Sequence, residues 1–189
     1  MDERSARRQR LQQRMAAQGI DGVIVTQNVD LYYFAGSMQT GYLFIPAEGE
    51  PVYFVRRSVT RALEEAFVKV EELGSMRSLG AKLAEAYPAL FRRDDGTAVV
   101  LAAEYDVLPV QQFQRLEGAL PGVRWVDGSM LIRELRMIKS EAEIAAIRES
   151  ARVIDIAFEE AIRALKPGMT EVELVASVES VIRQYGHMG

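Results

Sequence analysis

The chain has 189 residues, of which 49% are hydrophobic and 26% are charged, and its formal net charge is −4 at pH 7. These values are ordinary for a globular protein, and the mild acidity argues against non-specific nucleic-acid binding. The sequence contains no cysteine, which excludes disulfides, thiol nucleophiles and thiolate metal sites and fits a reducing compartment. No apolar run reaches the roughly 18 residues of a membrane span, and the charged N-terminus lacks a signal-peptide core. We therefore expect a cytoplasmic protein without nucleic-acid or membrane partners.

The first segment is predicted to be a helix that ends near Gln18. Leu11 and Met15 lie at helical spacing and give this helix an apolar stripe. The same segment carries a cluster of arginines: Arg4, Arg7, Arg8, Arg10 and Arg14. Such a cluster can act as a phosphate-binding arm. We favour a solvated helix face, because the apolar stripe already accounts for the pattern.

Strands and helices alternate over the next hundred residues. Short β-branched and apolar runs predict strands at residues 22–26, 42–45, 52–55, 68–73, 98–101 and 123–126. Apolar residues at helical spacing predict helices at 59–67, with Ser58 as its cap, at 79–90 and at 110–116. Alternation of this kind is typical of an α/β domain. We place its boundary near Asp127-Gly128.

Each of three local patterns in the chain allows both a purely structural and a functional interpretation. The aromatic side chains at 32–34, 42 and 44 can stack a ligand, but core packing is favoured. The glycine-bounded segment 36–41 lacks the lysine and the spacing of a phosphate loop, so a turn is expected. The glutamate pairs at 64–65 and 159–160 lie on predicted helices and are expected to be solvated.

The tail has the clearest local signals. Ser140-x-x-Glu143 and Thr170-x-x-Glu173 are capping boxes, each followed by apolar residues that step by three and four. Pro167 and Gly168 end the first of these helices. The short link predicts an antiparallel helix pair. Its apolar faces are long and need a covering partner, so we expect self-association.

The sequence offers few candidates for catalytic or metal-ligating residues. The chain has one histidine, His187, and no carboxylates flank it at metal-ligand spacing. No nucleophile elbow or phosphate-binding glycine motif is present. We therefore assign no catalytic residue, no metal ligand and no cofactor to this chain.

Three segments carry a family resemblance. Residues 136–144 (RMIKSEAEI) and 165–174 (LKPGMTEVEL) are similar to the opening and the first helix junction of a pita-bread domain. Residues 28–36 (NVDLYYFAG) are similar to a segment of the N-terminal domain that precedes it. In this order, the segments resemble the creatinase/prolidase/aminopeptidase P family of Xaa-Pro metallopeptidases.

The resemblance implies a creatinase/prolidase-like N-terminal domain over residues 1–128, with a mixed β-sheet flanked by helices. Residues 129–189 would be the initial helices of a truncated metallopeptidase domain. The implied parent is an Xaa-Pro dipeptidase or aminopeptidase that acts on peptide substrates, as a homodimer, with two divalent ions of Mn, Co or Zn. The family's metal ligands lie downstream, so the 189-residue chain itself is expected to be inactive and to serve oligomerisation and substrate gating.

The resemblance also gives His187 a candidate role. It would lie in the first strand of the pita-bread sheet, starting at Gly186, and would line the substrate-binding pocket. The alternative, in which a histidine near the end of the chain has no role, has equal weight. For the parent, a creatinase-like non-peptidase hydrolase and a metal-free binding module of the same fold stay open.

Overall fold

The computed structural model describes residues 3–93 and 96–187. The chain divides into two compact units, Met1–Met137 and Ile138–Gly189. The boundary predicted near Gly128 lies before this division, because helix α7 (Ser129–Met137) belongs to the first unit. Its Leu131, Ile132 and Leu135 are at most 5% exposed and lie in the first unit's core.

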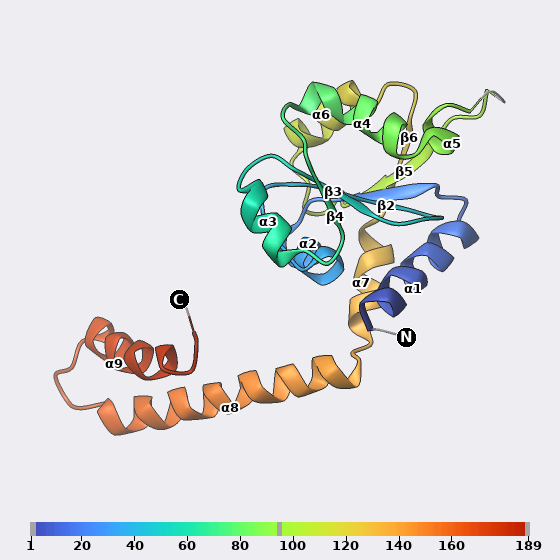
Figure 1. The fold of residues 1–189 in the computed structure, drawn as a ribbon. Coiled ribbons are helices and arrows are strands. Elements are labelled where there is room, and N and C mark those ends of the chain that lie inside the picture. The colour runs from blue at the N-terminus through green and yellow to red at the C-terminus, as the bar shows by residue number, and fades with distance from the viewer. Residues whose placement is uncertain (1–2, 94–95, 188–189) are drawn as a thin grey trace. The chain divides into compact units, whose positions relative to one another are not determined.

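Within the described residues, a six-stranded mixed sheet forms the centre of the first unit, in the order β4-β3-β2-β1-β5-β6 (Figure 1). β1 pairs with β2, and β2 with β3, in antiparallel fashion, whereas the other neighbours are parallel. Every residue of β1, β3 and β5 is buried, as expected for strands covered on both faces. The predicted α/β class with a mixed sheet is confirmed. The strands are β1 (Gly22–Val25), β2 (Gly41–Pro46), β3 (Val52–Val55), β4 (Lys69–Glu72), β5 (Val100–Ala103) and β6 (Arg124–Asp127).

Helices cover both faces of this sheet (Figure 1). On one face, buried Leu11 of α1 and Leu31 of α2 pack with α7. On the other, buried Leu83 of α4 and Leu116 of α6 pack together. The helices of the first face are α1 (Glu3–Ala17), α2 (Asn28–Ala35), α3 (Val59–Glu65) and α7, and those of the second are α4 (Leu79–Ala86), α5 (Pro88–Phe91) and α6 (Val110–Ala119), with a 3-10 turn η1 (Met76–Ser78) before α4.

Two sequence predictions about side chains need correction. Core packing is confirmed for Phe34, Tyr42 and Phe44, but it is wrong for Tyr32, which is 62% exposed on α2. The segment 28–35 forms a helix, and Tyr32 lies on the face that points away from the core. Ser58 precedes α3 with φ of 58° and makes no side-chain capping bond, so it is not the predicted cap.

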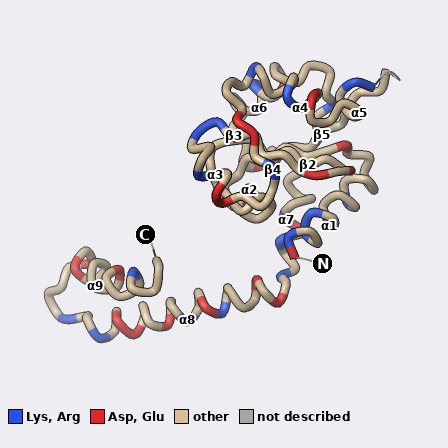
Figure 2. Tube along the Cα trace, in the orientation of Figure 1, with Lys and Arg blue, Asp and Glu red and all other residues tan. Residues whose placement is uncertain are grey.

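The arginines of α1 attach the helix to its surroundings. Arg14 pairs with Glu134 of α7 at 2.5 Å, and Arg8 pairs with Glu50. Arg7 lies 4.3 Å from the centre of the Tyr33 ring. Figure 2 shows these basic residues along α1. The predicted solvated face is therefore wrong for these arginines, because ion pairs and ring contacts hold them against the first unit.

The second unit contains α8 (Glu141–Ala164) and α9 (Glu171–Arg183). Both predicted capping boxes are confirmed: the N–H of Glu143 donates to Ser140 Oγ at 3.2 Å, and that of Glu173 to Thr170 Oγ1 at 3.3 Å. Ser177 of α9 donates to Glu160 of α8 at 2.8 Å, so Glu160 links the helices rather than being solvated.

Large apolar side chains of this helix pair face solvent, among them Ile154, Phe158, Ile162 and Val172, which are 64–78% exposed. The predicted apolar faces are therefore present but uncovered. None of the helices in the described part of the chain is both long and apolar enough for a membrane span.

Candidate functional site

A braced loop connects α2 to β2. The hydroxyl of buried Ser37 donates to Glu65 Oε2 at 2.7 Å, and Gln39 Nε2 donates to the same oxygen at 3.2 Å. The Tyr53 hydroxyl donates to the carbonyl of Gln39. These bonds fix the loop from α3 and from β3.

The Glu65 carboxylate is the centre of this bracing. The Ser37 hydroxyl and then the Arg61 guanidinium lower its pKa from the usual value, since both bind the charged form. The predicted solvation of the pair Glu64-Glu65 holds for exposed Glu64 and is wrong for Glu65. Sequence reasoning missed Glu65 because its partners lie 26 and 28 residues away.

Gly36 and Phe67 make a close contact at the start of the loop. Gly36 ends α2 with φ of 83°, a conformation that favours glycine. A Cβ atom at this position would lie 2.6 Å from Cδ1 of Phe67. The absence of a side chain thus lets the Phe67 ring cover the turn.

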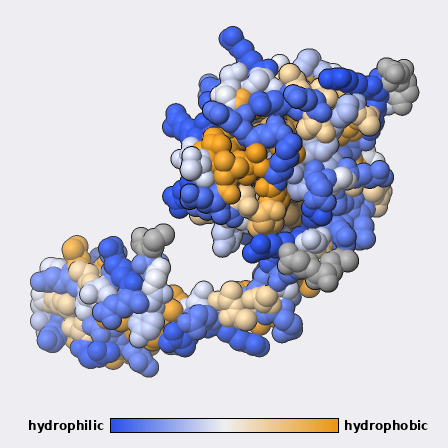
Figure 3. All heavy atoms as spheres, viewed as in Figure 1, coloured by the Kyte–Doolittle hydropathy of each residue, from blue (hydrophilic) through white to orange (hydrophobic). Residues whose placement is uncertain are grey.

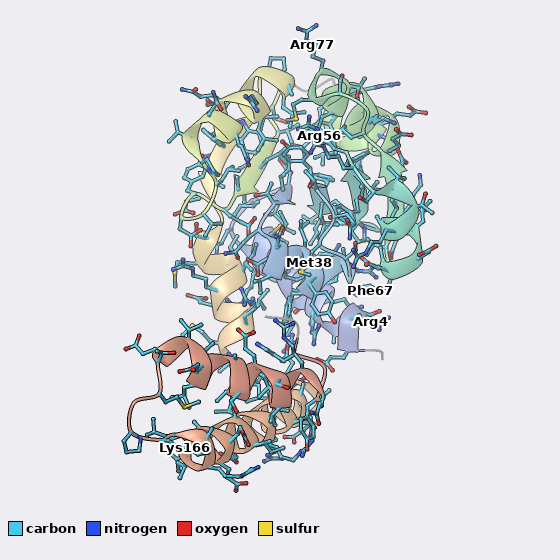
Figure 4. All side chains as sticks on the ribbon, turned by 90° about the vertical axis from the view of Figure 1, so that its left-hand side faces the viewer. Arg4, Met38, Arg56, Phe67, Arg77 and Lys166 are labelled. Carbon is cyan, nitrogen blue, oxygen red and sulfur yellow. The ribbon has the colours of Figure 1, made fainter. Side chains whose placement is uncertain are left out.

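A pocket with a volume of about 530 Å³ opens beside this contact. Arg4 lies over the Phe67 ring, 4.5 Å from its centre. In Figure 4, Arg4, Phe67 and Met38 lie on the same side of the first unit. The pocket is lined by Glu3, Arg4, Arg7, Tyr32, Gly36, Glu65 and Phe67.

Exposed apolar side chains lie on the elements that line the pocket. Tyr32, Met38 and Leu63 are 62%, 53% and 60% exposed. Figure 3 shows hydrophobic residues gathered on this face, where α2, α3 and β4 lie. Aromatic rings, guanidiniums and carboxylates bind peptide backbone and side chains, but this set holds no metal ligand cluster. The face offers aromatic, cationic and acidic groups for contact with a peptide or protein surface.

His187, the sequence-predicted pocket residue, lies just after α9. It is exposed, and its backbone N–H donates to the carbonyl of Ile182 at 3.3 Å. Gly186 has φ of 87° and ends the helix, so residues 186–187 form no strand. Met188 and Gly189, which complete the predicted strand, lie outside the described residues.

The fold is an α/β unit built on a six-stranded mixed sheet, followed by a unit of two capped helices. Residues 7–138 match the family described as the Creatinase/Prolidase N-terminal domain. The chain belongs to this family.

Known relatives are about twice as long. A probable dipeptidase, PepE, from Mycobacterium tuberculosis (strain H37Rv) is 31% identical over 174 residues, which cover 89% of this chain and 45% of the relative. The prolidase of Pyrococcus horikoshii OT3 has a TM-score of 0.78 and 27% identity, over 95% of this chain and 49% of that one. The Xaa-Pro dipeptidase from Bacillus anthracis has a TM-score of 0.80 at 23% identity and shares the fold, over 97% and 50% of the two chains. The chain therefore spans about half the length of the relatives it matches.

Proposed function

We propose that this chain is the N-terminal portion of a metal-dependent Xaa-Pro dipeptidase or aminopeptidase. The observation that carries the proposal is the match to the Pyrococcus horikoshii prolidase, which runs through both units and covers 95% of this chain. A match to the first unit alone would support only a shared domain.

The role that we propose for the first unit is homodimer contact and substrate gating. The braced loop supports this role, because Ser37 and Gln39 are fixed while Met38 and Tyr32 are left exposed. A rigid loop with exposed apolar side chains loses little entropy when it meets a second subunit or a peptide. The substrate of the whole protein would be a peptide with proline in the second position.

The metal ions of such an enzyme do not fit the residues of this chain. Within residues 3–93 and 96–187, no group of three or more His, Cys, Asp or Glu side chains converges as a metal site. We therefore assign no catalytic step to these residues. The Mn, Co or Zn ions would be held by the downstream domain.

Two further parts of the proposal concern location and His187. The lack of cysteine supports a cytoplasmic location. For His187, we propose a place in the lining of the substrate pocket of the complete enzyme. Its exposed side chain is free to meet a downstream domain. An H187A variant of the longer protein should raise KM for the peptide with little change in kcat.

The test compares the 189-residue protein with a protein that continues through the downstream domain. Each is assayed with Mn, Co and Zn on an Xaa-Pro dipeptide and on creatine. We expect metal-dependent release of the first residue by the longer protein alone. Release by the 189-residue protein would contradict the assignment. Cleavage of creatine alone would favour a creatinase-like hydrolase, and inactivity on both would favour a metal-free binding module.

A further inference from the structure

A second candidate site of the first unit lies at a topological switch point of the sheet, between the neighbouring strands β1 and β5. From β1 the chain continues to β2, β3 and β4 on one side, whereas β5 continues to β6 on the other. β1 and β5 are parallel neighbours, with Gly22 opposite Leu101. After β1 the chain enters α2 on one face, and after β5 it reaches α6 on the other (Figure 1). In open α/β sheets, ligands bind in the crevice outside such a pair of carboxyl ends.

A cavity of about 170 Å³ lies at this point. We call it the switch-point cavity. Its polar lining comes from the loops after β1 and β5, from the first turn of α2 and from α7. These polar residues are Gln27, Asp30, Glu104, Asp106, Ser129, Arg133 and Arg136.

The inner wall of the switch-point cavity is acidic. Glu104 and Asp30 are 2% and 4% exposed. Glu104 Oε2 accepts hydrogen bonds from the backbone N–H groups of Thr26 at 2.7 Å and Gln27 at 3.1 Å. Burial raises the pKa of Glu104 to about 7, and a hydrogen bond to the Asp30 carboxyl acts in the same direction. Glu104 therefore carries a proton in part of the molecules near neutral pH.

The α7 side of the cavity is basic. Arg136 Nη1 donates to Asp30 Oδ1 at 2.8 Å. Arg133 pairs with Asp106, and the Arg133 side chain is 57% exposed, which places it at the mouth. With Glu104 protonated, the charges of the two arginines cancel those of Asp30 and Asp106. The lining is thus neutral overall but has an acidic inner end and a basic mouth.

We propose that the switch-point cavity binds a small free α-amino acid as its zwitterion. The ammonium group lies against Asp30 and Glu104 and takes the place of the Glu104 proton, so that Glu104 ionises. The carboxylate of the ligand binds the guanidinium of Arg133, which offers a two-pronged donor geometry. Arg136 keeps Asp30 in position.

Size and charge both select this ligand class. A cavity of about 150 Å³ holds a molecule the size of benzene, so the volume suits an amino acid as small as alanine. A zwitterion pairs with both ends of the cavity, whereas a simple amine leaves the basic mouth without a ligand carboxylate and a simple carboxylate leaves the acidic inner end without an ammonium group. The ligand class rests on this lining and not on peptide hydrolysis. Binding to the 189-residue protein therefore tests it separately from the proposed function.

The experiment titrates the 189-residue protein with L-alanine and follows heat and amide NMR shifts. We expect saturable binding with one ligand per chain and shifts at residues 26–30, 104–107 and 129–136. Ethylamine and propionate, which each carry one of the two charges, should bind roughly tenfold more weakly or worse. Because binding displaces a proton, the affinity for L-alanine should rise between about pH 6 and about pH 8.

Variants of Glu104 and Arg133 test the acidic inner end and the basic mouth of the cavity separately. E104Q and R133Q should each weaken L-alanine binding by roughly tenfold or more, and E104Q should also remove the rise with pH. R77Q is the matched control, because Arg77 is exposed and projects away from the rest of the first unit in Figure 4. Its affinity should equal that of the unchanged protein.

The proposal is overturned if L-alanine does not bind saturably, or if folded E104Q and R133Q bind it as tightly as R77Q does. If either variant fails to fold, the comparison of ligands on the unchanged protein still tests the proposal. Equal affinity for ethylamine, propionate and L-alanine would then show that no zwitterion site exists.

Discussion

The Phe67 ring covers Gly36, and the backbone N–H of Phe67 donates to the carbonyl of Ala35 at 3.0 Å. This contact joins the end of α2 to the segment between α3 and β4. It also closes one wall of the pocket beside Arg4. The braced loop therefore depends on a residue without a side chain at position 36.

A G36A variant should be less stable than the unchanged protein, by about 2 kcal/mol or more. A left-handed conformation costs an L-residue about 1–2 kcal/mol, and the new methyl group also meets the Phe67 ring. Chemical unfolding measures the loss. G19A is the matched control: Gly19 has φ of 64°, but nothing lies within 4 Å of an added Cβ. If both variants lose equal stability, the Phe67 contact contributes nothing.

An E65Q variant should loosen the braced loop. The Glu65 carboxylate accepts from Ser37, Gln39 and Arg61, and an amide replaces part of this acceptor capacity with donors. Amide exchange of residues 37–40 should become faster, while E64Q, at an exposed position, should leave it unchanged.

The same bracing should weaken in acid. The pKa of Glu65 is lowered by the Ser37 hydrogen bond and by Arg61, so the folded protein favours the carboxylate. The stabilisation is present above the ordinary pKa of a glutamate and is lost as the pH falls through the lowered value. Protection of residues 37–40 against amide exchange, measured relative to the intrinsic rate at each pH, should therefore fall in acid in the unchanged protein but not in E65Q. Equal acid sensitivity in both proteins would assign the effect to other groups.

Glu104 should give stability the opposite pH dependence. Burial raises its pKa from 4.5 to about 7, so between these values the folded protein holds a proton that the unfolded chain has lost. The free energy of unfolding therefore falls as the pH rises through this window, by on the order of 3 kcal/mol.

An E104Q variant checks this account, since its neutral amide imitates the protonated acid. It should unfold at a higher denaturant concentration than the unchanged protein at about pH 8. The advantage should vanish in acid. E117Q, at an exposed position of α6, serves as the control and should follow the unchanged protein. An E104Q protein with the unchanged pH profile would rule out Glu104 as the titrating group.

Local signals made much of this fold predictable. The capping boxes at Ser140 and Thr170 each lie within four consecutive residues, so the sequence alone locates them. Short β-branched runs such as residues 22–25 predicted the strands for the same reason. The helix at Asn28–Ala35 was missed because its residues are apolar on nearly every side. The tertiary contacts of this segment, rather than the spacing of its apolar residues, determine that it is a helix.

The candidate sites depend on pairs that are distant in the sequence. Arg136 and Asp30 are 106 residues apart, and Glu104 and Thr26 are 78 residues apart. Asp30 could not be singled out from the sequence, since nothing nearby marks it as buried. Glu104 directly follows a buried strand, and the carboxyl end of a strand was the one signal that could have singled it out.

Removing the capping hydroxyls should destabilise the helix pair. S140A and T170A should each cost about 1 kcal/mol, because each leaves a backbone N–H at the helix start without its side-chain acceptor. Amide exchange in the first turns of α8 and α9 measures the effect. S150A, at an exposed position within α8, should not slow or speed that exchange. Unchanged exchange in both cap variants would show that the boxes add no stability.

The uncovered face of the helix pair should make the 189-residue protein self-associate. Ile154 and Phe158 are each 66% exposed, and burial of such side chains contributes about 25 cal/mol per Å². Light scattering should show a mass above that of a monomer, and I154E and F158E should lower it. D155K changes an exposed charge on the same helix and should leave more of the association intact, because it removes no apolar area. A monomer at high protein concentration would contradict the prediction, since the apolar residues would then be tolerated in water without a partner.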